Sequence, residues 1–165
     1  MRVPRFPLVL ILMFTVGAAG WMYAQRSNPA GTLSPEDVRG IELLVEGYTR
    51  GIDIGPEDAS WVFARDAVFE YAGGTVTGEA ELREFYGELR QRNTTRTIRH
   101  LLSNLVIKPS PGGATGSVYL TTIDESLTVS AVGMYEDTYV KTADGWRIGR
   151  RLYRRDLPPE VAGAQ

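Results

Sequence analysis

His100 is the only histidine in this 165-residue chain, and it lies in a segment, residues 97–107, that the sequence predicts to be a long β-strand. Side chains alternate along a strand, which places His100, Leu102 and Asn104 on one face and Leu101, Ser103 and Leu105 on the other. An imidazole can give and take protons near neutral pH. His100 is therefore either a core histidine bonded to a backbone carbonyl or an acid–base group.

Composition excludes several classes of site. The chain has no cysteine, which rules out disulfides, thiolate catalysis and cysteine-bound metals, and one histidine cannot make a histidine-rich zinc site. A net charge of −2 without a basic patch argues against nucleic-acid binding. We expect no metal and no organic cofactor.

The first 25 residues have the layout of a secretory signal. Arg2 and Arg5 precede an uncharged, mostly apolar run over residues 6–24, with small residues at 17–20. The run is also long enough to serve as an uncleaved membrane anchor. We predict a signal peptide or N-terminal anchor (1–25), a linker (26–33), one domain (34–156) and a C-terminal tail (157–165). The protein is then periplasmic or secreted, or held at a membrane by residues 6–24.

Three helices are predicted before the histidine strand. Ser34 and Pro35 mark a helix start, and apolar residues then recur at three- and four-residue spacing as far as Ile52. Asp53 follows, between two glycines. A second helix is expected from Pro56 to Asp66 and a third from about residue 78 to 93.

The remaining segments are predicted strands: residues 67–71, 75–77, 97–107, 114–129, 130–141 and 146–153, with an Asp-Gly turn at 144–145. Helices followed by long antiparallel strands indicate an α+β fold. We expect three N-terminal helices packed on a strongly curved, mostly antiparallel sheet that leaves an internal cavity.

Several short stretches together resemble one known family. They are residues 48–53 (YTRGID), 63–69 (FARDAVF), Gly78 with Leu82 and 85–86, Arg99-His100 with Asn104, and 144–148 (DGWRI). This pattern resembles the SnoaL-like family of the nuclear transport factor 2-like (NTF2-like) superfamily, and within it the scytalone dehydratase type. The resemblance implies a cone-shaped fold in which Asp53 supports His100 and Tyr71 helps to hold a water against a substrate carbonyl. Two positions depart from that enzyme: Ile52 replaces a tyrosine, and the strand containing Tyr119 lacks a second histidine.

Six candidate site residues are each assigned a role. Asp53, His100 and Tyr71 are the predicted catalytic residues, and Tyr48, Asn104 and Tyr119 the predicted substrate-binding residues. The alternatives are that Asp53 caps the second helix, and that Tyr48 and Tyr71 are core tyrosines with a hydroxyl at the rim. Five arginines near the end of the domain are expected on a solvated strand face or a dimer contact: Arg147, Arg150, Arg151, Arg154 and Arg155.

Three functions fit this pattern. The first is an exported, cofactor-independent lyase or isomerase of dehydratase type, in which the Asp53–His100 dyad acts on a small, cyclic, carbonyl-bearing molecule. The second is a non-catalytic module that holds a hydrophobic small molecule in the same cavity. The third is an accessory subunit of a larger enzyme, which export disfavours. A homodimer or homotrimer formed through the sheet is expected.

Overall fold

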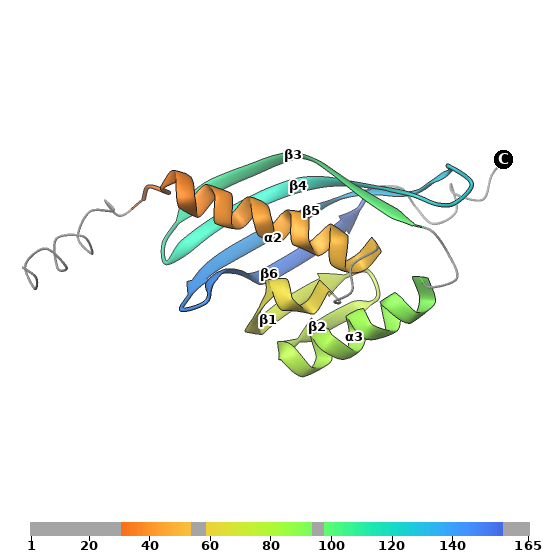
Figure 1. The fold of residues 1–165 in the computed structure, drawn as a ribbon, viewed down its shortest axis with the longest axis horizontal. Helices are drawn as coiled ribbons and strands as arrows, with labels where there is room; N and C mark the ends of the chain where they lie inside the picture. Colours follow the sequence, from red (N-terminus) through yellow and green to blue (C-terminus); the bar gives the residue numbers. More distant parts are fainter. Residues whose placement is uncertain (1–30, 54–58, 94–97, 157–165) are drawn as a thin grey trace, which may run out of the picture. The chain divides into compact units, whose positions relative to one another are not determined.

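The computed structural model describes residues 31–53, 59–93 and 98–156. Its elements, in chain order, are α2 (Pro35–Asp53), the 3₁₀ helix η1 (Ala59–Val62), β1 (Phe63–Tyr71), β2 (Gly74–Thr77), α3 (Gly78–Asn93), β3 (Arg99–Ser110), β4 (Gly113–Ile123), β5 (Val129–Thr142) and β6 (Gly145–Arg155) (Figure 1). The predicted α+β class is confirmed. The predicted N-terminal segment 1–25 and tail 157–165 lie outside the described residues. No helix within the described ranges is long and apolar enough to cross a membrane.

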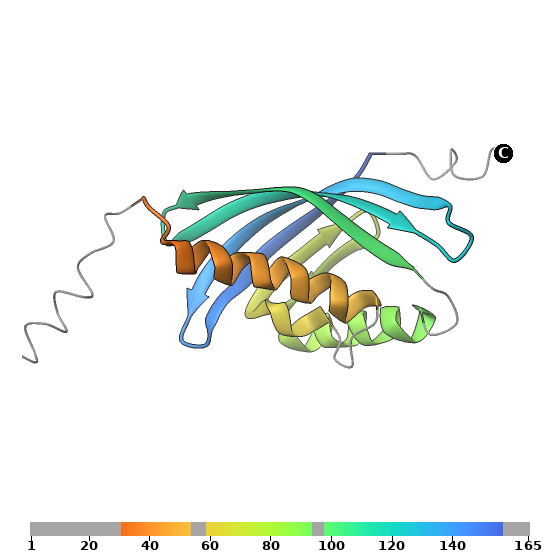
Figure 2. The ribbon, with the colours of Figure 1, turned by 45° about the horizontal axis from the view of Figure 1, so that its top comes forward.

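All six strands form one curved sheet in the order β2-β1-β6-β5-β4-β3. Every neighbouring pair is antiparallel except β1 and β6, which run parallel. The helices lie along the inner side of the curve, with α2 crossing the longer strands (Figure 2). Strand β3, which carries His100, is therefore an edge strand that lies beside α2.

Helix α2 begins with a capping box. The backbone N–H of Asp37 donates to Ser34 Oγ, and the backbone N–H of Ser34 donates to the Asp37 carboxylate, both at 3.1 Å. The same carboxylate accepts from Lys141 Nζ at 2.6 Å and from Trp146 Nε1 at 3.0 Å. Asp37 therefore both caps the helix and ties its first turn to the β5–β6 hairpin.

The apolar stripe predicted for this helix forms the part of the core that α2 contributes. Ile41, Leu44, Tyr48 and Ile52 are each less than 5% exposed. Their three- and four-residue spacing puts them on one face, which packs on the inner side of the sheet. This packing fixes the direction of the helix and so determines where its last residue, Asp53, lies.

The prediction of three α-helices is wrong in detail. The described residues hold two α-helices and the four-residue η1, and the predicted second helix overlaps strand β1, which begins at Phe63. Residues 54–58, where that helix was expected to start, lie outside the described ranges. The apolar residues 61–64 lie in the predicted second helix, but Phe63 pairs with Ile148 of β6, so this run enters the sheet. A short apolar run does not by itself distinguish a buried strand from a buried helix.

Two β-bulges change which side chains point inward. The β3–β4 register shifts between Ser103 and Val106, where Asn104 has a φ of 55°. In β6, Gly149 is the extra residue, because Thr138 pairs with Arg150 while Tyr139 pairs with Ile148. Strict alternation therefore fails beyond each of these points.

Candidate functional site

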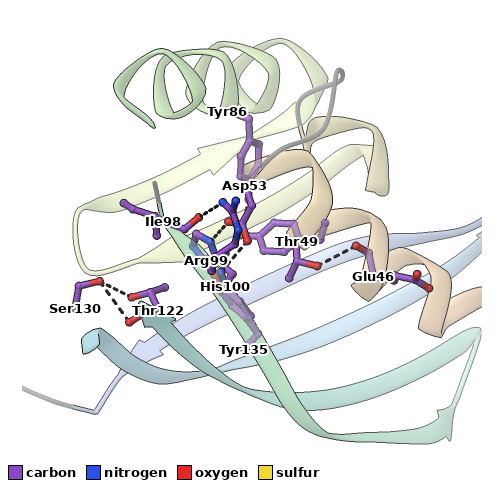
Figure 3. Close-up of polar contacts among 11 residues, drawn as sticks. Glu46, Thr49, Asp53, Tyr86, Ile98, Arg99, His100, Thr122, Ser130 and Tyr135 are labelled. Carbon is purple, nitrogen blue, oxygen red and sulfur yellow. Dashed lines mark hydrogen bonds and ion pairs between the residues drawn. The ribbon is translucent and has the colours of Figure 1, made fainter. Parts of the chain in front are cut away.

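Asp53 and His100 are in direct contact. Asp53 is the last residue of α2 and His100 the second residue of β3, and their side chains point at one another (Figure 3). His100 Nδ1 lies 2.5 Å from Asp53 Oδ1, and the backbone N–H of His100 donates to Asp53 Oδ2 at 2.8 Å. The side chains are only 8% (Asp53) and 13% (His100) exposed. Two short hydrogen bonds thus hold one carboxylate against one residue.

This geometry selects a tautomer of the imidazole. An ionised carboxylate only accepts hydrogen bonds, so the ring nitrogen facing it must carry a proton. With the proton on Nδ1, the neutral ring has its lone pair on Nε2, which has no hydrogen-bond partner among the described residues. The pair is therefore arranged to leave one basic nitrogen available.

The position of Asp53 is unfavourable for the helix alone. The C-terminal end of a helix carries partial negative charge, so a carboxylate in the last turn costs about 0.3–1 kcal/mol. The two N–H groups of His100 offset that cost. A residue that is locally unfavourable but firmly bonded is often found at a functional site.

His100 lines a groove of about 380 Å³ between α2 and β3. The helix wall is charged and includes Arg39, Glu42 and Glu46, whereas apolar side chains make up much of the rest. The full lining is Arg39, Glu42, Val45, Glu46, Thr49, His100, Leu102, Ser103, Asn104, Leu105 and Val118. The groove offers a small molecule both an apolar surface and charged groups.

Strand alternation misplaces Asn104, and Tyr119 does not line the groove. Because of the bulge in β3, Asn104 is exposed and Leu105 packs against the core, although Asn104 still lines the groove. Tyr119 pairs with Ser103 on the outer face of the sheet and is 51% exposed. Tyr119 thus points away from His100, and the expectation that it lines the cavity is wrong.

The two other predicted tyrosines lie in aromatic clusters. Tyr71 stacks on Phe69 with ring centroids 5.4 Å apart and packs against Phe85 at 5.3 Å. Within the described ranges, no hydrogen bond joins Tyr71 to Asp53 or His100, whose bonds are to each other. Tyr48 is 2% exposed, and its hydroxyl bonds with those of Tyr86 and Tyr135.

A buried ion pair that the sequence did not reveal lies near Tyr48. Arg151 donates to Asp137 through Nε at 2.7 Å and Nη2 at 2.6 Å, and both side chains are fully buried. The expectation that Arg151 lies on a solvated face is wrong. Without the bulge at Gly149, Arg150 would point inward and Arg151 outward, so only the position of the bulge could have revealed this residue.

Burial governs the ionisation of these groups. Burial alone would lower the pKa of Arg151, but the carboxylate of Asp137 holds that pKa well above its ordinary value. Burial also raises the pKa of Tyr86 and Tyr135 well above the usual range. These residues form what we call the interior polar cluster, in which an Arg151–Asp137 ion pair lies among tyrosine hydroxyls. Its six members are Tyr48, Tyr86, Tyr135, Asp137, Tyr139 and Arg151.

The described residues contain no group of three or more His, Asp or Glu side chains placed to hold a metal ion. Asp53 and His100 form a pair, and a metal site needs more ligands than a pair supplies. The chemistry that the Asp53–His100 pair can perform is proton transfer.

The sequence of the chain identifies its family. Residues 34–152 match the SnoaL-like domain model, and the chain belongs to this family. The expected resemblance to SnoaL-like proteins is thereby confirmed. No curated protein matches the chain at a significant level.

Solved structures show the same fold. A protein of unknown function with a cystatin-like fold from Nostoc punctiforme PCC 73102 is 23% identical, with a TM-score of 0.67 over 78% of this chain and 98% of that one. An NTF2-like protein from Novosphingobium aromaticivorans is 18% identical, with a TM-score of 0.67 over 94% and 99%. A candidate scytalone dehydratase from Novosphingobium aromaticivorans DSM 12444 is 23% identical, with a TM-score of 0.61 over 73% and 84%. At such low identities these similarities establish the fold alone.

Proposed function

We propose that this chain is a cofactor-independent lyase or isomerase of dehydratase type, in which His100 is the acid–base group and Asp53 orients it. The substrate is a small, cyclic, carbonyl-bearing molecule bound in the groove between α2 and β3. The observation that carries the proposal is the 2.5 Å contact from Asp53 to His100 Nδ1 beside that groove.

The chemistry follows from the free nitrogen. His100 Nε2 takes a proton from the carbon next to the substrate carbonyl, and the electron pair of the broken C–H bond forms an enolate. Asp53 stabilises the imidazolium that results. In a dehydration, the imidazolium returns its proton to a β-hydroxyl group, which leaves as water as the enone forms. In an isomerisation, the proton returns to another carbon.

Turnover of cyclic β-hydroxy ketones, followed by enone absorbance, tests this proposal. Replacing the base by His100→Ala should reduce kcat by about 10²–10⁴-fold, the usual contribution of a positioned acid or base. Asp66→Asn is the control, because Asp66 is an exposed acid on β1. Turnover that is the same in the wild type and in His100→Ala would refute the role of His100.

The second candidate is a non-catalytic binding module. The observation that favours it is the apolar part of the groove, formed by Val45, Leu102, Leu105 and Val118. This alternative predicts that none of the cyclic β-hydroxy ketones is turned over. It also predicts that a hydrophobic ligand binds wild type and His100→Ala with similar affinity.

We further propose that copies of the chain associate through the outer face of the sheet. Exposed apolar side chains on β3 and β4 support this: Leu101 is 50%, Val106 44% and Tyr119 51% exposed. Tyr119→Asp should convert a dimer or trimer to a monomer in light scattering. A wild-type protein that is monomeric at high concentration would contradict this assembly.

We also propose that the protein is exported, or anchored in a membrane through residues 6–24. It is supported by the charged, apolar and small-residue order of residues 1–25. Cell fractionation with N-terminal sequencing separates a cleaved, exported form from an anchored one. Full-length protein in the cytosolic fraction would contradict both.

A further inference from the structure

Arg151 is held rigidly at the centre of the sheet. It lies on β6, opposite Asp137 of β5 and Phe69 of β1. Its guanidinium packs against two aromatic rings that are nearly perpendicular to each other, 4.1 Å from the centroid of Tyr48 and 4.2 Å from that of Tyr135. These two rings and the two bonds to Asp137 hold the guanidinium in place.

One edge of this guanidinium makes no hydrogen bond with the rest of the described residues. Nε and Nη2 are bonded to Asp137, but Nη1 is the one buried side-chain nitrogen or oxygen without a hydrogen-bond partner among the described residues. A buried donor without an acceptor costs about 1–3 kcal/mol, and more when it is charged. Native interiors satisfy most such groups with protein, water or a ligand.

The tyrosines beside Arg151 supply a further donor. Tyr86 bonds to Tyr48 at 3.3 Å and Tyr48 to Tyr135 at 3.2 Å, both longer than the 2.7–2.8 Å typical of hydroxyl pairs. Three hydroxyl groups have three protons but make only two bonds with one another. One proton is therefore left over, whichever way the chain of bonds runs.

No acceptor oxygen in the cluster lies within hydrogen-bond distance of Arg151 Nη1. Oδ1 of Asp137 accepts from Arg151, and Oδ2 accepts from both Arg151 and the Tyr139 hydroxyl at 2.9 Å. The interior thus has a surplus of donors, one of them on a cation. The missing partner is an acceptor oxygen, and a negatively charged oxygen complements the site best.

Helix α2 links the interior polar cluster to the groove of His100. Val45 and Thr49, three residues before and one residue after Tyr48 on α2, both line that groove. Residues three apart on a helix share a face, and the Tyr48 ring lies 4.1 Å from the central carbon of the Arg151 guanidinium, so the helix turn that lines the groove also covers Arg151.

We propose that Arg151 Nη1 and the spare tyrosine proton form a binding site for an anionic oxygen on a flat ring, either a carboxylate or an enolate. The ligand enters past Tyr48, its ring replaces the Tyr48–Tyr135 contact, and its oxygen accepts from Nη1. The inference rests on the proposed function in one respect: the same ligand also reaches His100. An enolate formed there by proton removal would have its charge stabilised by Arg151.

Calorimetry with two pairs of probes tests the site. Benzoate represents a carboxylate and 4-nitrophenolate an enolate, and their neutral counterparts are benzamide and 4-nitroanisole. Wild type should bind at least one anion about tenfold more tightly than its neutral counterpart, as expected for a charge-assisted hydrogen bond in a buried site. The pair that shows the preference identifies the chemical class of the ligand.

Variants must avoid leaving Asp137 buried without a partner, because a broken buried ion pair destabilises the fold. The double variant Arg151→Met/Asp137→Leu replaces both charges by apolar groups and should lose the preference for anions. His100→Ala should keep it. Binding therefore remains measurable if turnover fails, and the inference and the proposed function can fail separately.

A measurement on unmodified protein completes the test. The Arg151 Nε–H group is buried and bonded to Asp137, so it should give a protected side-chain resonance in ¹⁵N NMR. Saturation with the preferred anion should shift this resonance. Equal affinity for anions and neutral probes, or an Arg151 resonance unmoved at saturation, would overturn the inference and leave the cluster as a structural ion pair.

Discussion

The substitution Asp53→Asn tests the central contact through stability. Asp53 accepts from two N–H groups of His100, and an asparagine has only one acceptor oxygen for them. Losing a hydrogen bond to a buried charged group costs about 1.5–3 kcal/mol. Removing a negative charge from the helix C-terminus returns about 0.3–1 kcal/mol. The free energy of unfolding should therefore fall by about 1–2 kcal/mol.

Urea denaturation followed by tryptophan fluorescence measures this change. Asp66→Asn makes the same chemical change at an exposed site and should alter the free energy of unfolding by no more than about 0.5 kcal/mol. If Asp53→Asn lowers the free energy of unfolding no more than this control does, the two hydrogen bonds to His100 contribute nothing to stability, and the structural basis of the site is wrong.

Two further predictions concern the scaffold. The hydrogen bond from Lys141 holds the pKa of Asp37 well below its ordinary value, so Asp37→Asn should destabilise the protein by about 1–2 kcal/mol at pH 7. Because protonation of Asp37 removes this advantage of the wild type, the free energies of unfolding of the two proteins, measured in urea, should converge as the pH falls below about 4. A difference that stays the same at every pH would contradict this prediction. In thermal unfolding, Gly113→Ala should lower Tm, because its Cβ would overlap the carbonyl oxygen of Tyr139 at a cost of about 1–3 kcal/mol. Gly87→Ala, in open space on α3, should instead raise stability by up to about 1 kcal/mol, and equal effects of the two substitutions would contradict the packing.

The helices and the site differ in how far the sequence determines them. The capping residues of α2 and its apolar stripe are local signals, and they predicted the helix that carries Asp53. Neither signal shows that Asp53 meets His100, 47 positions further along the chain. That pairing was predicted from the resemblance to SnoaL-like proteins, because contacts between distant elements depend on the whole fold.

Asn104 and Arg151 were misplaced for the same physical reason. A β-bulge reverses the facing of every later residue in a strand. The bulge at Asn104 put Leu105 inside, and the one at Gly149 put Arg151 inside. Gly149 and Asn104 are residue types that favour such bulges, but both also occur in regular strands, so neither residue by itself showed where the alternation changes. Tyr119 was misplaced for a different reason: it lies between Val118 and Leu120, which are buried, so regular alternation along β4 turns it outward.

The tautomer of His100 tests the central claim most directly. Because the chain has one histidine, its ring nitrogens can be observed by ¹⁵N NMR without ambiguity of assignment. At a pH where the ring is neutral, the contact with Asp53 predicts a proton on Nδ1 and a free lone pair on Nε2, and Asp53→Asn should abolish this preference. A proton on Nε2, or two tautomers in rapid exchange in the wild type, would contradict the assignment of His100 as the base.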